Sequence, residues 1–244
     1  MIFFTPRSGS SWLTDVLFQT GRLGKPIELF NPNHLFNLAS SAQTDNLADY
    51  TEAAKRFRVT EGVNGFELTL YQLNRMFARQ DGFVSQFGAG PHFWLIRRDI
   101  VAQAVSLAKM VTTQVSHSTI ASAQQRQDAE ASFDYSAKRI RHWLKHIAAL
   151  EQETEGMFAK FGLNPVRLSY EQMMALGPNR IARLIGSKLG VEDLPNLTGT
   201  SRHTKLGTSK NQEFAERFRA DQADFIAQVE ANRRPWIEKL QDGA

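Results

Sequence analysis

An arginine, a glycine and several hydroxyl residues follow the first apolar run of the chain. The run from Ile2 to Phe4 leads into Arg7, Ser8, Gly9, Ser10, Ser11 and Trp12. Gly9 allows the backbone to approach an anion, and the amides of a helix that begins here would point at it. Arg7 adds positive charge and the serine hydroxyls add donors. The segment predicts a phosphate or sulfate site, with a serine-rich helix cap beside a surface arginine as the alternative.

A second junction of this kind follows the apolar run from Phe93 to Ile96. Arg97 and Arg98 come directly after that run, and Asp99 can cap the helix that we expect next. Ser106 lies about two helical turns beyond Asp99 on the same face. Open α/β sheets bind ligands at the carboxyl ends of their strands. An arginine and this hydroxyl could therefore hold a second phosphate, although a capped, solvated helix start is also possible.

Two familiar nucleophile and nucleotide motifs are absent from the first junction. The G-x-x-x-x-G-K-[ST] loop of ATPases needs a second glycine and a lysine before the hydroxyl, and neither occurs here. Gly-x-Ser-x-Gly is also absent, so a serine hydrolase is not supported.

Four short apolar runs each precede a segment with helical periodicity, which is the alternation of parallel strand-helix-strand units. The runs are Ile2 to Thr5, Gly62 to Phe66, Phe93 to Ile96 and Pro165 to Leu168. The pattern predicts an α/β fold with a central parallel sheet flanked by helices.

Helices and loops follow from the remaining periodicity. We predict helices at Ser10–Thr20, after Asp99, at Tyr135–Phe161 and at Gln212–Val229. The helix at 135–161 carries apolar residues at three- and four-residue steps, so one stripe should pack in the core. Two segments rich in Pro, Asn, Ser or Gly are predicted to be loops, Lys25–Asn46 and Gly190–Asn211.

The composition is that of an ordinary globular protein and favours one domain over residues 1–244. The absence of cysteine excludes a disulfide scaffold, a thiolate metal site and a cysteine nucleophile. The formal charge of +4 suits a polyanionic ligand, and the basic cluster Lys138–His142 is interpreted as a solvated helix face and not as a nucleic-acid site. No apolar run reaches membrane-helix length and the start lacks a signal-peptide pattern, which favours a cytoplasmic location.

Together, the two junctions resemble those of bacterial sulfotransferases of the trehalose 2-sulfotransferase type. The likeness rests on Arg-Ser-Gly-Ser at the first junction, a Glu-x-Phe element after the first helix, and Arg-x-Asp-x-x-x-Gln-Ala-Val-Ser at the second. It continues in the same order through Tyr170-Glu171 and Arg202–Arg219. The resemblance implies a P-loop-like three-layer sandwich that uses 3′-phosphoadenosine 5′-phosphosulfate (PAPS) as sulfuryl donor, without a metal.

The resemblance also implies roles for individual residues. Arg7 to Trp12 would hold the 5′-phosphosulfate, and Arg97 with Ser106 would hold the 3′-phosphate. Arg98 is the alternative to Arg97, because its spacing to the serine fits other sulfotransferases better. Glu28 would be the general base, and Arg7 would stabilise the leaving phosphate. A late basic loop would close over the nucleotide through Arg202, Lys205 and Lys210.

Some features leave alternatives open. Relatives tend to carry Gly-x-Lys after the second strand, where this chain has an acid, Glu67, which leaves the substrate pocket undefined. His34 and His117 are rival bases, since many sulfotransferases use histidine. His142 and His146 have metal-ligand spacing on one helix face, but no third ligand is evident, so we predict no metal site.

The sequence thus predicts an enzyme that transfers a sulfuryl group to the hydroxyl of a small molecule or glycolipid, with a carbohydrate as the expected kind of acceptor. One alternative is a nucleotide-binding module without turnover. Another is a phosphotransferase on the same scaffold, which the missing P-loop lysine disfavours. Relatives pair as dimers, so a homodimer stays open, and no nucleic-acid partner or transmembrane segment is expected.

Overall fold

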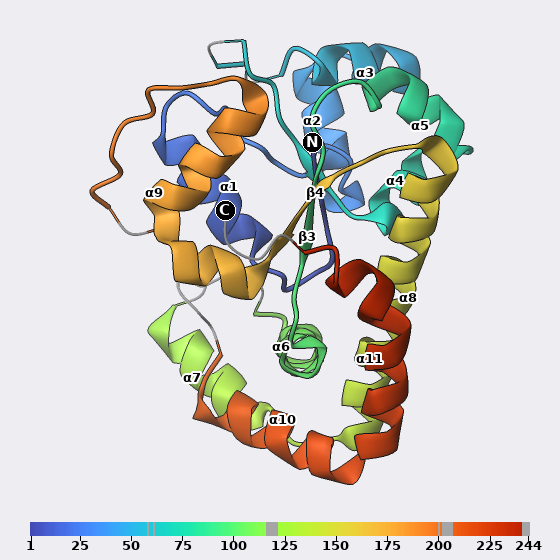
Figure 1. The fold of residues 1–244 in the computed structure, drawn as a ribbon, viewed down its shortest axis with the longest axis vertical. Coiled ribbons are helices and arrows are strands. Elements are labelled where there is room, and N and C mark those ends of the chain that lie inside the picture. Colours follow the sequence, from blue (N-terminus) through green and yellow to red (C-terminus); the bar gives the residue numbers. More distant parts are fainter. Residues whose placement is uncertain (58, 61, 116–121, 200, 202–206, 241–244) are drawn as a thin grey trace.

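A parallel sheet lies at the centre of the molecule, with helices on both of its faces (Figure 1). The computed structural model describes all residues except 58, 61, 116–121, 200, 202–206 and 241–244, and in this part four strands have the order β2-β1-β3-β4. The strands are β1 (Ile2–Phe4), β2 (Glu67–Leu68), β3 (Phe93–Ile96) and β4 (Val166–Ser169). All neighbouring pairs are parallel, so the predicted α/β fold is confirmed.

The second strand begins later than its apolar run predicts, and the expectation of a strand over Gly62–Phe66 is wrong. Val63 pairs with Thr60 in an antiparallel bridge, with N–O distances of 3.0 and 2.8 Å. Gly62 has a φ of 82°, a conformation that glycine adopts without strain. The apolar stretch therefore turns back on itself, and β2 begins only at Glu67.

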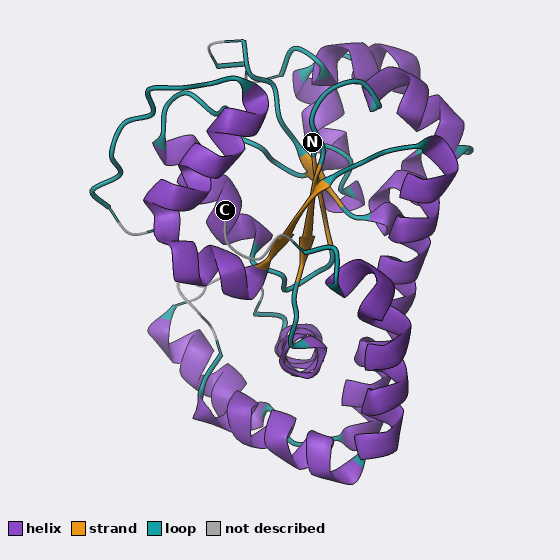
Figure 2. Cartoon of the chain, in the orientation of Figure 1, coloured by secondary structure: helices purple, strands orange, loops and turns teal. Residues whose placement is uncertain are grey.

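Alternate side chains of the strands enter different hydrophobic clusters, as the pleat of a strand requires. Phe3 of β1 packs into one cluster, while Ile2 and Phe4 pack into another. β3 alternates in the same way, with Trp94 beside Phe3 and Leu95 beside Phe4. Both faces of the sheet are therefore covered, which gives three layers (Figure 2).

One face of the sheet is covered by α1 (Ser10–Gln19) and α9 (Tyr170–Leu189), drawn on the left in Figure 1. Leu13 and Val16 of α1 pack in the same buried cluster as Ile181 of α9. The predicted first helix is thus confirmed almost to the residue.

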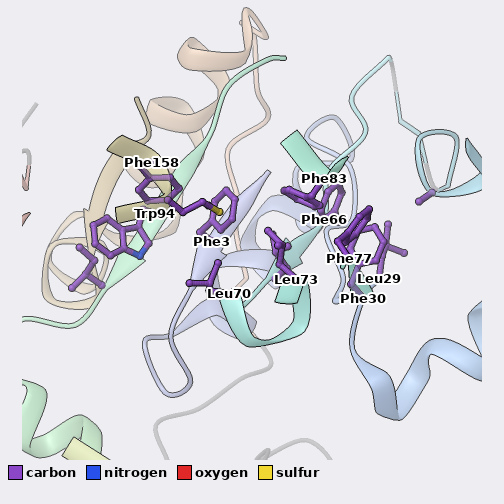
Figure 3. Close-up of a cluster of buried hydrophobic side chains, with 14 of the residues drawn as sticks. Phe3, Leu29, Phe30, Phe66, Leu70, Leu73, Phe77, Phe83, Trp94 and Phe158 are labelled. Atoms are coloured by element: carbon purple, nitrogen blue, oxygen red, sulfur yellow. The ribbon is translucent and has the colours of Figure 1, made fainter. Parts of the chain in front are cut away.

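The other face is covered by α8 (Ala137–Phe161) and a group of short helices. These are α2 (Pro32–Ser41), α3 (Leu47–Ala54), α4 (Leu70–Met76) and α5 (Gln80–Phe87). Figure 3 shows their shared cluster, in which Phe3 meets Phe158 of α8 edge-on at 5.0 Å between ring centroids. Phe30 meets Phe66 and Phe77 edge-on at 5.4 and 5.5 Å, and such contacts fix ring orientation. The segment around Phe30 is therefore anchored in the core.

The predicted loop over Lys25–Asn46 is wrong in part, because it contains α2. The Asn31 side chain accepts a hydrogen bond from the Asn33 amide at 3.0 Å and so caps this helix, and Pro32 suits its first turn. No residue of α2 is fully buried, and the proline, asparagine and serine residues of the segment are typical of loops, which explains the wrong prediction.

A third group of helices packs below the sheet in Figure 1: α6 (Ile100–Thr113), α7 (Ala123–Ser132), α10 (Ser209–Asp221) and α11 (Ala223–Ile237). The predicted single helix at Gln212–Val229 is in fact α10 and α11, which meet at Gln222, where φ is −135° and ψ is 32°. Within the described ranges, no helix has the length and apolarity needed to cross a membrane.

A buried ion pair ties α11 to the carboxyl end of β3. Arg233 is 2% exposed and donates to both carboxylate oxygens of Glu151 on α8, at 2.7 and 3.0 Å. It also donates to the carbonyl oxygens of Arg97 at 2.7 Å and Arg98 at 3.1 Å. Trp236 donates to Glu151 at 2.9 Å. The last helix therefore holds the backbone at the second predicted junction.

We predict that Arg233→Met destabilises the fold by about 3–5 kcal/mol, because it leaves the Glu151 charge buried without its partner. The adjacent Arg234 is exposed, so Arg234→Met is the matched control and should change stability by less than about 0.5 kcal/mol. Urea unfolding of both variants measures the difference. Equal, small effects would contradict the role assigned to the ion pair.

Candidate functional site

All four strands end at one edge of the sheet, because they are parallel. At that edge β1 leads into the loop 5–9, β2 into Thr69, β3 into Arg97 and β4 into Tyr170. β1 lies beside β3 in the sheet, with Phe4 paired to Leu95. The two predicted junctions are therefore neighbours in space.

The loop after β1 forms an open helix start. Gly9 is the N-cap of α1, has a φ of 92° and gives no side-chain cap, and the first turn contains no acidic residue. The amides of Ser10 and Ser11 lie where a helix offers no internal acceptor. A β carbon on Gly9 would lie 2.7 Å from Cδ2 of Tyr170. The position needs glycine, and the first amides of the helix suit an anion.

Ser8 is a buried residue of this loop, 0% exposed, and its hydroxyl group has no hydrogen-bond partner among the residues that the structure describes. Gln103 of α6 holds the loop, since its Nε2 donates to Thr5 Oγ1 at 2.9 Å and to the Pro6 carbonyl at 2.8 Å. A buried hydroxyl without a partner costs free energy, which an anionic oxygen bound there would offset.

Arg7 joins the two junctions directly. Its Nε donates to Ser106 Oγ of α6 at 3.0 Å, and Arg97 Nη1 lies 3.5 Å from the Arg7 carbonyl oxygen. Burial and then the positive charge of Arg97 lower the pKa of Arg7, while Tyr170 raises it. Two guanidinium groups held this close repel each other, and a bound anion would relieve that repulsion.

Arg97 is oriented by an aromatic ring and keeps one donor unused. Its guanidinium carbon lies 4.8 Å from the centroid of the Tyr170 ring. Its buried Nε has no hydrogen-bond partner in the described part of the chain, and Glu171 Oε1 lies 3.9 Å away. A ligand that approaches Arg97 would find a pre-positioned donor.

The second junction itself is held by carboxylates. The backbone amides of Arg98 and Asp99 donate to Glu171 of α9 at 3.0 and 3.2 Å. Asp99 caps α6 as predicted, because its Oδ1 accepts from the Ala102 amide at 2.9 Å. Arg219 of α10 donates to the same oxygen at 2.7 Å. The start of α6 is thus occupied by protein groups, whereas its N-cap residue gives α1 no side-chain cap.

Glu28 lies at the same edge of the sheet, half-buried in the loop between α1 and α2. Its Oε2 accepts hydrogen bonds from Asn31 Nδ2 at 2.8 Å and from Gln72 Nε2. Gln72 is itself fixed, because it forms a capping box with Thr69 at the start of α4. The carboxylate therefore has a defined orientation, which suits a group that accepts a proton from a bound substrate.

Glu67 is a second carboxyl group beside Glu28. It is 6% exposed at the start of the two-residue strand β2, and its Oε2 has no hydrogen-bond partner within the described residues. Burial, followed by the charge of Glu28, raises the pKa of Glu67 to about 8, while a hydrogen bond with Ser10 opposes this shift. Ser10 belongs to the loop and helix start at residues 7–12, which we call the anion cradle. Glu67 is therefore hydrogen-bonded to the cradle and acts electrostatically on Glu28.

The remaining candidates lie elsewhere or were not described. Arg202, Lys205 and His117 lie outside the described residues. Lys210 donates to the backbone carbonyl of Glu130 on α7 at 2.8 Å, so its ammonium group serves that helix in this structure. His34 is exposed on α2.

Two other places in the structure, the histidine pair on α8 and a cavity beside His92, do not form a second candidate site. His142 and His146 both pack edge-on against Trp143, and no group of three potential metal ligands occurs among the residues described. A cavity of about 320 Å³ lies at the opposite edge of the sheet, lined in part by His92 and Asn164. It contains neither junction.

The comparisons with known proteins agree with the geometry of this edge. Residues 1–221 match the family described as Stf0 sulphotransferase. The chain therefore belongs to the Stf0 sulphotransferase family, which makes it a transferase of the kind that uses a sulfuryl donor and a small-molecule acceptor. A comparison with curated proteins gives no match. The matched segment ends with α10, so α11 and Arg233 lie beyond it.

Several residues that build the site were not predicted for these roles. Gln103 stands inside the quoted Gln-Ala-Val-Ser motif, which was the available signal for it. Gln72 follows Thr69 at capping-box spacing, which predicts a helix start but not its hydrogen bond to Glu28. The contacts of Arg233 depend on tertiary packing alone.

We predict that Gly9→Ala destabilises the protein more than Gly21→Ala does. Both positions have a left-handed φ, so each alanine costs about 1 kcal/mol of backbone strain. Only at Gly9 does the new β carbon collide, with Tyr170, which adds about 1–3 kcal/mol, whereas Gly21 has open space. Urea unfolding measures both costs, and equal values would contradict the crowding at the cradle.

Proposed function

We propose that the protein transfers a sulfuryl group from PAPS to a hydroxyl group. The observation that carries the proposal is the Arg7–Ser106 hydrogen bond at 3.0 Å, which joins two anion-suited junctions in one site. The unpartnered Ser8 Oγ and Arg97 Nε lie one at each junction. A nucleotide with separate 5′ and 3′ anionic groups would satisfy both at once.

The residues present fit the two anionic ends of this donor. The amides and hydroxyls of Ser10 and Ser11, with Ser8, suit the 5′-phosphosulfate. Arg97 and Ser106 suit the 3′-phosphate. Arg7 belongs to the first junction and contacts both of these residues, so it links the two phosphate sites. Trp12 is half-buried beside the cradle. When bound, the donor supplies a sulfuryl group attached to a phosphate that can leave.

Glu28 is proposed as the general base. The acceptor oxygen would form a bond to sulfur while the bridging bond from sulfur to the phosphate oxygen breaks, and the hydroxyl proton would pass to Glu28. Arg7 would stabilise the charge that develops on the leaving phosphate. Because Asn31 and Gln72 both bind Oε2, the other oxygen of Glu28 is the one we assign to the proton. We propose a carbohydrate or glycolipid as acceptor, as the resemblance to sulfotransferases of the trehalose 2-sulfotransferase type implies.

We also propose that residues 1–244 act as one sulfotransferase domain. Trp236 and Leu240 pack in the same cluster as Phe3 of the central sheet, which supports this view.

We predict that Glu28→Gln lowers kcat at least about a hundredfold, because the amide cannot take the proton. The KM for PAPS should change less than about threefold, since the mutation leaves both junctions intact. Initial rates of 3′-phosphoadenosine 5′-phosphate release, measured over a panel of sugars and glycolipids, test this. The exposed Glu230→Gln is the matched control. Full activity of the Glu28 variant, or turnover that requires ATP and magnesium, would overturn the proposal.

We predict that Arg97→Met raises the KM for PAPS by about tenfold or more, the value of a lost charge-assisted hydrogen bond. Arg98→Met is the matched comparison and should have the smaller effect, because Arg97 stacks on Tyr170 and lies beside Arg7. Donor titrations at saturating acceptor measure both values. A larger effect at Arg98 would reassign the 3′-phosphate to that residue.

A further inference from the structure

The carboxyl group of Glu67 stands behind the anion cradle, and no cation from the described part of the chain acts on it. The groups that act on it are the Ser10 hydroxyl from α1 and the Glu28 carboxylate from the loop before α2, and within the described residues no positively charged group is among them. Gln72 of α4 binds Glu28, and the Glu67 amide donates to the Ile27 carbonyl at 3.0 Å. An ionised Glu67 would thus put a second negative charge beside Glu28, directly behind a residue that must face an anion.

The direction of the hydrogen bond between Ser10 and Glu67 decides whether the Ser10 hydroxyl can donate to a ligand. A hydroxyl has a single hydrogen but can accept as well. If Glu67 is ionised, the Ser10 hydrogen must point back at the carboxylate, and only oxygen lone pairs face the cradle. If Glu67 is a neutral acid, its own O–H can donate to Ser10 Oγ, which frees the Ser10 hydrogen for an anionic oxygen in the cradle.

We propose that Glu67 is a positioning residue that works as a neutral carboxylic acid, donates to Ser10 and thereby turns the Ser10 hydroxyl towards the anionic group of the donor. The inference rests on the proposed function, because it assumes that an anion occupies the cradle. It explains why a buried acidic residue adjoins a site for anions, where a basic residue would be expected. The burial of Glu67 and its raised pKa of about 8 agree with this protonation state at neutral pH.

The protonation state is tested without any ligand. Because the folded-state pKa lies above the ordinary 4.5, the wild type binds more protons folded than unfolded, and its stability falls as pH rises from 4.5 to about 8. Glu67→Gln lacks this loss, so its urea midpoint relative to wild type should rise through that window and then level off. The exposed Glu230→Gln should show no such trend. A constant difference between Glu67→Gln and wild type would overturn the inference.

The effect on the cradle is tested by calorimetric binding of 3′-phosphoadenosine 5′-phosphate between pH 7 and about 9.5, above the ordinary second pKa of a phosphate. The wild-type Kd should rise at least about tenfold across this range as Glu67 ionises. In Glu67→Gln the Kd at pH 9.5 should be nearly the same as the Kd at pH 7. In Glu230→Gln the Kd should rise across this range as it does in the wild type. An undiminished pH dependence in Glu67→Gln would overturn the inference.

Ser10→Ala tests whether Glu67 acts on the ligand through the Ser10 hydroxyl or only through its own charge. The substitution should weaken binding about tenfold at pH 7, where the hydroxyl serves the ligand, and have almost no effect at pH 9.5, where it has already turned away. An equal loss at both pH values would show that charge acts through space and would overturn the proposed role of Ser10. If the bisphosphate binds at no pH, the proposed function fails, while the unfolding experiment still decides whether Glu67 is neutral.

Discussion

The parallel pairing of β1 with β3 is the constraint on which the candidate site depends. Because these strands lie side by side and point the same way, the loop after Phe4 and the loop after Ile96 open at the same edge. Arg7 can then reach Ser106 although the two residues are far apart in sequence. If either strand had another position in the sheet, the two anion-suited junctions would lie apart even with the same residues.

Long-range polar contacts keep the two loops in place beneath the site. Gln103 holds the first loop from α6, Glu171 holds the second from α9, and Arg233 holds the second again from α11. The three side chains bind backbone groups of the loops, which are the Pro6 carbonyl, the Arg98 amide and the Arg97 carbonyl. Ser8 Oγ and Arg97 Nε are two of the buried polar atoms that have no hydrogen-bond partner among the described residues, and they lie one at each junction. Others, such as His92 Nε2 and Arg167 Nε, lie away from this edge, so the missing partner points to a ligand only where a charged or anion-suited loop adjoins it.

The junctions could be predicted because their signals are local. A short apolar run followed by glycine, serine and arginine defines a strand end and a helix start within a few residues, and this is why the predicted α1 and α6 are observed. The helix α2 was missed because it buries little, and the second strand was misplaced because a turn at Gly62 uses apolar residues. Local pattern does not distinguish an apolar turn from a short strand.

The sequence shows which residues near the site are charged, but it does not predict which of them lie close together. Glu28 was assigned from the family resemblance, and Glu67 appeared as an unexplained acid. Their proximity depends on how β2 lies beside the loop before α2, which is set by tertiary packing. The same holds for Arg233, which lies beyond the predicted helix Gln212–Val229 and is buried only through the tertiary fold.

The most direct test of the account is a calorimetric titration of the wild-type protein with 3′-phosphoadenosine 5′-phosphate, compared with adenosine 5′-phosphate and ATP. Two anion-suited junctions in one site predict micromolar binding of the bisphosphate and at least about tenfold weaker binding when the 3′-phosphate is removed, the value of a charge-assisted hydrogen bond. Equal binding of all three nucleotides, or no binding, would contradict the claim that the edge formed by β1 and β3 is a two-phosphate site.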